Sequence, residues 1–304
     1  MKLHKDCITC LGRIGHQVAR NACKDRHAKR EVVRLGEAVL REAFRPDKCP
    51  PWLASRALEE ISAVTGESDP YHSVRQKEMA AAQKIYRRIS SLFGGDFTSC
   101  VELAVLGNNL DFFRDTRDLE AVLIEEHGRR PNFYIDHIER AQSVLNSLKN
   151  GSVLFLADNA GEVFFDIPLM ENINSLGAKV VYGVKDKPFL NDLTWADLEE
   201  FGILSQIPRV MSTGTAAILD LQSLSEAFRQ ELETCDLIIS KGQANYECLS
   251  ELPIKRNIFY LLKAKCQPIS RALNVPLNSH VALLAETSVK ENSTRQDEAG
   301  DRPV

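Results

Sequence analysis

The stretch LFLADNAGEVFFD, residues 154–166, ends a run of apolar residues with a cluster of polar ones. Five of the six residues from 152 to 157 are apolar, which is typical of a buried strand, and Asp158, Asn159 and Glu162 follow directly. The apolar residues then return with a different period. Because a buried charge is costly unless it is compensated, the stretch raises the question of what offsets these carboxylates.

The residues after Gly151 alternate between short apolar runs and helical patterns, which predicts strands separated by helices. Such βαβ units form a parallel sheet that is buried on both faces. The expected strands contain the sequences SVLFLA, AKVVYGV, RVMST, DLIIS and NIFYLL. The fold class predicted for this part of the chain is therefore α/β.

The first half of the chain shows helical periodicity. Between Val74 and Phe93, apolar residues recur three or four positions apart while lysines and arginines occupy the other face. Similar patterns predict helices at residues 5–20, 32–44, 52–64, 118–126 and 136–148. We therefore expect an all-helical N-terminal domain at residues 1–150, an α/β domain at 151–287 and a disordered polar tail at 288–304.

Composition and charge exclude some partners. The 304 residues carry a formal net charge of -4, whereas nucleic-acid binding usually needs clustered lysines and arginines. The basic run from Arg26 to Arg34 contains Glu31 and is typical of a solvated helix face. No apolar run approaches the length of a membrane span, and the first residues lack the apolar core of a signal peptide. We expect a cytoplasmic protein with no nucleic-acid or membrane partner.

Polar residues gather where the expected strands end. In an open parallel sheet, ligands bind outside the carboxyl ends of the strands, where helix N-termini also converge. The residues after the five strands, in chain order, are Asp158, Asn159, Gly161 and Glu162; Lys185, Asp186, Asn191 and Asp192; Ser212, Thr213, Gly214 and Thr215; Lys241, Gly242, Gln243 and Asn245; and Lys263. The sequence thus predicts one rim of carboxylates, amides, hydroxyls and lysines.

The oxygen ligands of this rim suit a hard divalent ion such as Mg²⁺ or Mn²⁺. Lysines beside such an ion suggest an anionic ligand, most simply a phosphate. Asp158 and Asn159 would then be metal ligands whose buried charge the ion offsets, and Gly161 would let the backbone approach the ligand. A plainer alternative is that Asp158 and Asn159 form a turn or a helix cap, and that Lys263 extends to solvent.

Six ordered blocks resemble the signature of the damage-control metal-dependent phosphatases, a family long known only as a domain of unknown function. The blocks are GNNLDF at 107–112, DNAGEVFFD at 158–166, NDLTWAD at 191–197, STG at 212–214, KGQANYE at 241–247 and LLKAKC at 261–266. The resemblance implies a helical domain packed on a Rossmann-like three-layer α/β domain. It also implies hydrolysis of small phosphorylated metabolites, such as sugar phosphates, with Mn²⁺, Mg²⁺, Co²⁺ or Ni²⁺ as cofactor.

The resemblance assigns roles by motif position. The implied metal ligands are Asp158, Asn159 and Asp192. The implied catalytic residues are Asp158, Glu162 and Lys263, with Lys263 contacting the phosphate. The implied substrate contacts are Asn109, Lys241 and Asn245. Water and the Asp158 carboxylate are both compatible with the role of nucleophile.

The chain has eight cysteines, which are expected to be reduced thiols in a cytoplasmic protein. Only Cys7 and Cys10 have the spacing of a motif, and this pair fits either structural thiols or a metal or redox site. In the stand-alone microbial branch of the resembled family, such a pair accompanies a block like Lys265-Cys266. We therefore expect Cys266 to lie near Cys7 and Cys10, where the three could bind a soft metal or hold the N-terminus in place.

Two other functions stay open. A protein carboxyl methyltransferase that uses S-adenosylmethionine could place LFLADNAGE at its nucleotide, but Gly161 is the only glycine of a G-x-G-x-x-G pattern present there. A non-catalytic binder of phosphorylated metabolites would keep the lysines and asparagines and would not need a pair of metal-binding aspartates.

Overall fold

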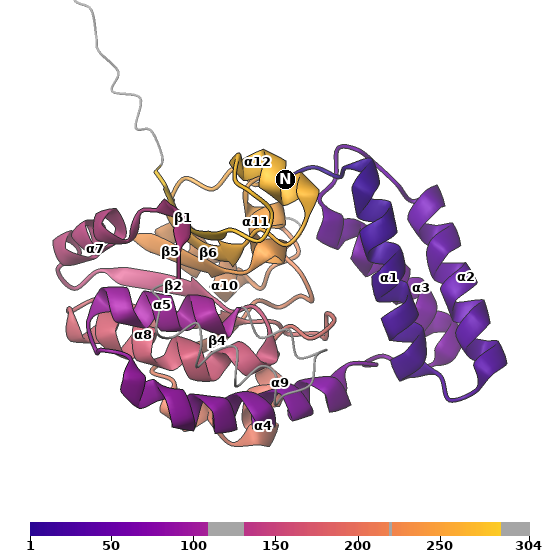
Figure 1. The fold of residues 1–304 in the computed structure, drawn as a ribbon, viewed down its shortest axis with the longest axis horizontal. Helices are drawn as coiled ribbons and strands as arrows, with labels where there is room; N and C mark the ends of the chain where they lie inside the picture. Colours follow the sequence, from indigo (N-terminus) through magenta and orange to yellow (C-terminus); the bar gives the residue numbers. More distant parts are fainter. Residues whose placement is uncertain (109–130, 219–220, 287–304) are drawn as a thin grey trace, which may run out of the picture.

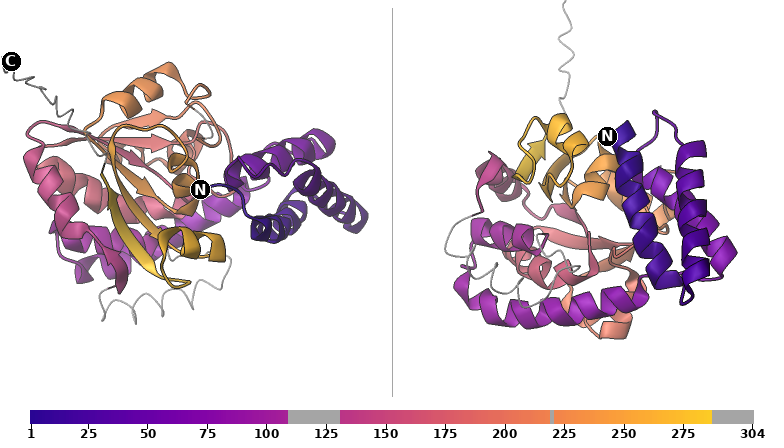
Figure 2. Two further views of the ribbon diagram at one scale, coloured as in Figure 1. Left: turned by 90° about the horizontal axis from the view of Figure 1, so that it is seen from above. Right: turned by 45° about the vertical axis from the view of Figure 1, so that its right-hand side comes forward.

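The computed structural model describes residues 1–108, 131–218 and 221–286. Three N-terminal helices form a unit that stands beside the rest of the protein, called here the three-helix unit (Figures 1 and 2). Its members are α1 at Lys5–Ala22, α2 at Arg26–Glu42 and α3 at Pro50–Thr65. Asp25 caps α2, because its carboxylate accepts hydrogen bonds from the backbone N–H groups of His27 at 2.7 Å and Ala28 at 2.9 Å.

The next two helices pack mainly on the sheet, although Val74 of the first one also packs against a buried cluster of the three-helix unit. They are α4 at His72–Ile89 and α5 at Phe97–Gly107, joined through the short 3-10 helix η1 at Ser90–Leu92. Met79, Ile85 and Ile89 of α4 are buried in the same hydrophobic core as the strands. Of the described helices in the first 150 residues, α1, α2 and α3 therefore stand apart from the sheet.

One sheet of seven strands occupies the centre of the described chain, in the order β1-β7-β6-β5-β2-β3-β4. The strands are β1 at Phe133–Asp136, β2 at Ser152–Leu156, β3 at Lys179–Val184, β4 at Val210–Ser212, β5 at Leu237–Lys241, β6 at Asn257–Lys263 and β7 at His280–Ala285. Neighbouring strands are parallel except for β6 and β7, which are antiparallel. The predicted α/β class is confirmed.

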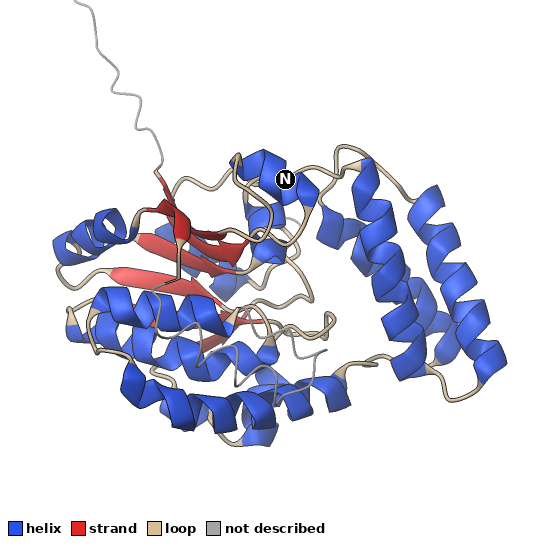
Figure 3. Ribbon diagram, in the orientation of Figure 1, coloured by secondary structure: helices blue, strands red, loops and turns tan. Residues whose placement is uncertain are grey.

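Helices cover both faces of this sheet and give a three-layer arrangement (Figure 3). Val153 and Phe155 of β2 face the layer that contains α4, α5 and α8 (Val163–Ser175). Leu154 and Leu156 face the opposite layer, which contains α10 (Glu226–Thr234), α11 (Gln243–Leu249) and α12 (Gln267–Leu273). All four side chains are at most 1% exposed, and each contributes roughly 1.5–3 kcal/mol through burial. The remaining described elements are α7 at Ile138–Ser147, η2 at Ala160–Glu162, α9 at Trp195–Phe201 and η3 at Leu204–Gln206.

Two strands differ from the sequence analysis. β1 lies before Gly151, in the half of the chain predicted to be wholly helical, and β7 was not predicted. β1 has only four residues, which is too short for alternation to distinguish a strand, and its sole partner in the described chain is β7. The predicted helix at 118–126 and the predicted tail at 288–304 lie outside the described residues.

The three-helix unit packs against loops at the carboxyl ends of the strands. Leu11 of α1 and Leu53 of α3 share a buried cluster with Phe189 and Ala217, which lie in loops following β3 and β4. This contact places the unit over the edge of the sheet where the polar rim was predicted. None of the helices in the described part of the chain is both long and apolar enough to cross a membrane.

Candidate active site

The loops that follow β2 and β3 lie side by side at the carboxyl edge of the sheet. Asn159 and Asp192 form an isolated antiparallel bridge, and the Leu193 N–H donates to the Asp158 carbonyl at 2.8 Å. The Ala160 N–H donates in turn to the Asn191 carbonyl at 2.9 Å. The backbone therefore brings together the three residues predicted as metal ligands.

Three carboxylates gather at this junction. Asp158, Glu162 and Asp192 are 7%, 1% and 5% exposed, so all three are largely withdrawn from water. Asp158 follows β2, Glu162 ends η2 and Asp192 lies in the loop between β3 and α9. Carboxylates this deeply buried and this close together need positive charge or hydrogen-bond donors nearby.

Two asparagines supply donors to this carboxylate cluster. Asn108 Nδ2 donates to Asp158 Oδ2 and to Glu162 Oε1, both at 2.9 Å. Asn159 Nδ2 donates to Glu162 Oε1 at 2.8 Å and to Asp158 Oδ2 at 3.3 Å. The sequence analysis selected Asn109, which lies outside the described residues, and missed Asn108 in the same GNNLDF block. Adjacent asparagines cannot be told apart by motif position alone.

Lys241 lies beneath the cluster and is fully buried. Its Nζ is 2.5 Å from Asp166 Oδ1 and 2.8 Å from Glu162 Oε2, and the Tyr182 hydroxyl donates to the other Asp166 oxygen at 2.9 Å. Lys241 is not among the residues that line the cleft described below. Its ammonium group supports two carboxylates, and Asp166 is a partner that the sequence analysis did not identify.

Lys185 and Asn245 complete the polar layer. Lys185 Nζ donates to Asn245 Oδ1 at 3.1 Å and lies 3.8 Å from Asp192 Oδ2. Asn245 Nδ2 donates to the Ala157 carbonyl at 2.8 Å and to the Lys241 carbonyl at 2.9 Å. Asn245 thus joins the ends of β2 and β5 while directing a lysine toward Asp192.

The two lysines of the LLKAKC block lie in different places. Lys265 lines the cleft with Asp158 and Asn159, and its charge favours ionisation of Asp158 and Glu162. Lys263, the predicted phosphate contact, is the last residue of β6, is paired in register with His280 of β7 and is not among the lining residues. The two lysines are only two positions apart near the end of β6. The sequence alone therefore does not show which of them lines the cleft.

The carboxyl groups differ in their readiness to ionise. Burial, reinforced by the charges of Glu162 and Asp192, raises the pKa of Asp158 well above its usual range. Burial also raises the pKa of Asp192 to about 6, although Lys185 opposes the shift. Burial disfavours ionisation of Glu162 as well, but Lys241 outweighs it and lowers the pKa of Glu162. A cation at Asp158 and Asp192 would relieve the repulsion among these groups.

The donor set fits a hard cation in chemical type. Asp158 and Asp192 offer carboxylate oxygens and Asn159 a carboxamide, which are ligands that Mg²⁺ and Mn²⁺ accept. Within residues 1–108, 131–218 and 221–286, no group of three or more His, Cys, Asp or Glu side chains could hold a metal ion. An ion at this place would therefore depend on two carboxylates, amide oxygen and the ligand or water that accompanies it.

A cleft of about 570 Å³ opens above these residues, between the sheet and the three-helix unit. Asp158, Asn159, Asp192 and Lys265 line one side, and the opposite side is contributed by α1 and the start of α3. Gly242, with φ of +77°, lies so close to Asp158 that a Cβ atom there would collide with the carboxylate. The cleft gives a small molecule access to the predicted metal ligands.

The three cysteines expected to meet all line this cleft. Burial raises the pKa of Cys266 to about 11, and the charges of Cys7 and Cys10 add to this effect. The Cys266 thiol also accepts a 3.4 Å hydrogen bond from Gln243 Nε2. The structure therefore places the three cysteines in one neighbourhood, but among the described residues they do not form a group of three side chains that could hold a metal ion.

A mostly parallel sheet with a polar rim under a helical unit defines an α/β protein with a small-molecule site at the carboxyl ends of its strands. The chain belongs to the family of the damage-control phosphatase ARMT1-like domain, whose model matches residues 3–281.

Similar proteins support this membership. The chain is 32% identical over 287 residues to the damage-control phosphatase PH1575 of Pyrococcus horikoshii, covering 93% of this chain and 98% of that protein. It is 29% identical over 298 residues to a damage-control phosphatase of Archaeoglobus fulgidus, covering 94% and 100%. The crystal structure of the Pyrococcus horikoshii protein, described as a DUF89 family protein, superposes with a TM-score of 0.83 and 31% identity over 93% of this chain and 99% of that one. The predicted family is confirmed.

Proposed function

We propose that this protein is a divalent-metal-dependent phosphatase that hydrolyses small phosphorylated metabolites, sugar phosphates among them. The observation that carries the proposal is the junction of Asp158, Asn159 and Asp192, with Lys185 and Lys265 beside it. The names of the relatives support phosphatase chemistry, and the cleft of about 570 Å³ suits a small molecule.

Asp158, Asn159 and Asp192 would hold the metal ion. A bound divalent ion supplies polarisation of the phosphoryl oxygens and helps to neutralise their charge. Asn108 and Asn159 fix the Asp158 carboxylate by donating to one of its oxygens. Lys265 would contact the phosphate from the wall of the cleft, in the role that the motif resemblance gave to Lys263.

The lower polar layer would maintain the shape of the site during turnover. Lys241 holds Glu162 and Asp166, and Lys185 lies between Asn245 and Asp192. These contacts fix the carboxylates before substrate arrives, so little reorganisation is needed in the transition state. The three-helix unit on the other side of the cleft would limit the access of bulk water to the phosphoryl group.

The test is phosphate release from p-nitrophenyl phosphate and from a panel of sugar phosphates. Activity is measured with a chelator and after adding back Mg²⁺, Mn²⁺, Co²⁺ or Ni²⁺. We expect metal-restored turnover in the wild type and a loss of at least about a hundredfold in Asp158→Asn and Asp192→Asn. Asp186→Asn is the matched control, because Asp186 also follows β3 but is exposed and bonds to Ser212.

The results of these assays test the assigned metal ligands and distinguish a phosphatase from a non-catalytic binder. Metal-dependent turnover that survives in both site variants would refute the assignment of Asp158 and Asp192. Phosphate binding without turnover under any metal would favour a non-catalytic binder of phosphorylated metabolites.

A further inference from the structure

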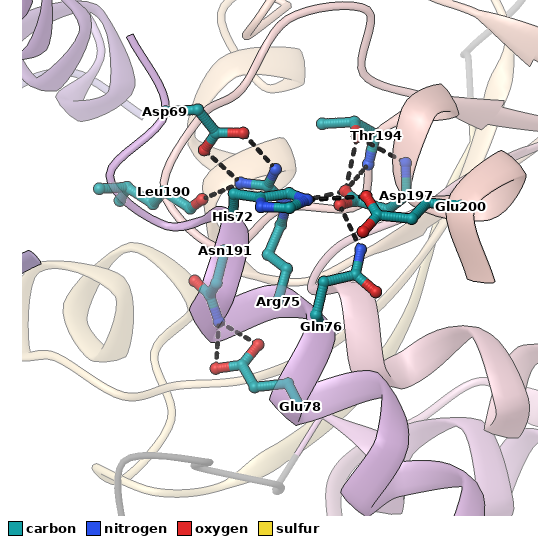
Figure 4. Close-up of polar contacts among 10 residues, drawn as sticks. All are labelled: Asp69, His72, Arg75, Gln76, Glu78, Leu190, Asn191, Thr194, Asp197 and Glu200. Atoms are coloured by element: carbon teal, nitrogen blue, oxygen red, sulfur yellow. Dashed lines mark hydrogen bonds and ion pairs between the residues drawn. The ribbon is translucent and has the colours of Figure 1, made fainter. Parts of the chain in front are cut away.

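Arg75 of α4 is a buried cation that lies outside the candidate site, with 1% of its surface exposed. Figure 4 shows its guanidinium group between two carboxylates from different parts of the chain. Its Nε donates to Asp197 Oδ2 at 2.7 Å, and its two terminal nitrogens donate to Asp69 at 2.8 and 2.6 Å. Asp69 lies in the segment that joins α3 to α4, and Asp197 lies in the first turn of α9.

A third contact of Arg75 reaches the loop of the candidate site. Its Nη1 donates to the Leu190 carbonyl at 3.2 Å. Leu190 has a φ of +52°, in the left-handed region that residues other than glycine seldom adopt. Such a conformation persists when surrounding contacts fix it, and Leu190 immediately precedes Asn191 and Asp192.

Glu78, one turn further along α4, holds the next residue of the same loop. Asn191 Nδ2 donates to the two Glu78 oxygens at 3.4 and 3.3 Å, as Figure 4 shows. The Asn191 carbonyl accepts the Ala160 N–H from the loop after β2. The segment before Asp192 is therefore held by α4 on one side and by the Asp158 loop on the other.

The end of the loop is fixed through Asp197. The Thr194 N–H donates to Asp197 Oδ2 at 3.0 Å and its hydroxyl donates to the same atom at 2.5 Å, while the Asp197 N–H donates to the Thr194 hydroxyl. This capping box begins α9. Because Arg75 binds the same Asp197 oxygen, one guanidinium group contacts the start of the loop that carries Asp192 directly and the end of that loop through Asp197.

We propose that Arg75 is a positioning residue for the cation site, which fixes the Leu190–Thr194 loop so that Asp192 is held beside Asp158. This inference rests on the proposed function, because Arg75 affects catalysis only if Asp158 and Asp192 bind the metal ion. Lysine cannot replace arginine in this role, because a single ammonium group lacks the planar fork that reaches two carboxylates and a carbonyl together.

The test compares Arg75→Lys and Asp69→Asn with His72→Gln as a matched control. His72 also lies on α4 and pairs with Glu200 of α9 at 2.7 Å, but in the described residues its side chain makes no hydrogen bond or ion pair with the 190–192 segment. Mn²⁺ affinity is measured by calorimetry below the melting temperature of each variant, and folding is checked by circular dichroism. We expect about a tenfold weaker Mn²⁺ affinity in Arg75→Lys, a smaller loss in Asp69→Asn and none in His72→Gln.

A second readout does not depend on metal. Hydrogen exchange of the Ala160 and Leu193 amides, measured without metal, reports whether the two loops stay joined, because these amides bond across them. We expect faster exchange at both amides in Arg75→Lys and unchanged exchange in His72→Gln. Should Arg75→Lys fail to fold, amide exchange in Asp69→Asn can be compared with the wild type instead. Asp69 binds Arg75 but lies outside the Leu190–Thr194 loop, and its side chain is 22% exposed.

The two proposals fail in different ways. A folded Arg75→Lys variant with wild-type Mn²⁺ affinity and wild-type amide exchange overturns the positioning role and leaves the proposed function intact. A wild type that binds no divalent ion overturns the proposed function, whereas faster exchange in Arg75→Lys would still support the positioning of the loop.

Discussion

The Sγ atoms of Cys49 and Cys248 lie 3.4 Å apart in the interior of the protein, although the two residues are 199 positions apart in the chain. Cys49 precedes α3 of the three-helix unit, and Cys248 lies in α11 beside β5. The pair therefore joins two parts of the protein that face each other across the cleft.

We expect peroxide to convert these two thiols into a disulfide. The hydrogen bond from Cys248 lowers the pKa of Cys49 to about 7, which favours the reactive thiolate. The thiolate attacks the peroxide, whose O–O bond breaks with release of hydroxide, and becomes a sulfenic acid; the Cys248 thiol then attacks this sulfur, which forms the disulfide and releases water. Peptide mapping by mass spectrometry should find Cys49 linked to Cys248, with Cys49→Ser as control. Linkage among the other cysteines while these two stay free would contradict the prediction.

Gly242→Ala tests the contact between the backbone and Asp158. An alanine here meets both a φ of +77° and a collision with the carboxylate, so we expect a loss of stability of about 1 kcal/mol or more together with a large loss of turnover. Gly202→Ala is a matched control, because Gly202 has a φ of +73° with open space where the Cβ would lie. Thermal unfolding and phosphatase assays of both variants separate backbone strain from damage to the site. Equal turnover in the two variants would contradict the role of Gly242.

Lys241→Met leaves Glu162 and Asp166 buried without their cation. Removing one partner of a buried ion pair costs about 3–5 kcal/mol, since the remaining charge has no compensation. We expect a loss of stability of that size in denaturant unfolding. Adding Glu162→Gln and Asp166→Asn to the same chain should recover most of the loss, because the two side chains that Lys241 contacts are then neutral. A triple variant no more stable than Lys241→Met would show that Lys241 acts mainly through packing.

His280 gives a prediction for the dependence of stability on pH. Burial, with the nearby charge of Lys263, lowers the pKa of His280 to about 4. The unfolded chain takes up a proton near the ordinary value of about 6.5, so stability is complete above that pH and falls as the pH decreases toward 4. The loss amounts to about 3 kcal/mol at most. Between pH 7 and pH 4, the free energy of unfolding should decrease less with falling pH in His280→Gln than in the wild type. The same pH dependence in both proteins would count against this interpretation.

The proximity of Asp158 and Asp192 could be predicted from the sequence because parallel strands present their carboxyl ends at one edge, whereas the choice of Asp192 as a third metal ligand came from the motif resemblance. Asp158 and Asp192 follow neighbouring strands, β2 and β3, so the α/β pattern alone indicates that their loops approach each other. The structure brings these loops together through the bridge between Asn159 and Asp192. This part of the site depends on topology, which hydrophobic periodicity reveals.

Other parts of the site depend on side-chain direction, which periodicity does not reveal. Which of Lys263 and Lys265 lines the cleft depends on the point where β6 ends, and Asn108 reaches the carboxylates from the end of α5. Asp166 occupies a position in α8 that looks like any polar residue of a helix until Lys241 and Tyr182 are placed beside it. Long-range pairing determines these roles.

Long-range pairing also determines the edge strand of the sheet, which local sequence does not show. β1 has four residues with alternating burial, and only its pairing with β7 identifies it as a strand. Arg75 likewise reads as one of several basic residues on a helix, because the carboxylates that bury it lie at Asp69 and Asp197. Neither feature has a local signal.

The sheet order has a consequence for the synthesis of the protein. β1 pairs with β7, so Phe133 meets its partner His280 only after the intervening 146 residues have left the ribosome. In the described chain, β7 lies between β1 and β6. A nascent chain that ends before β7 would therefore expose the facing edges of both strands, and such unpaired edges promote association with other chains. Completion of the sheet, and with it protection from aggregation, comes late in translation.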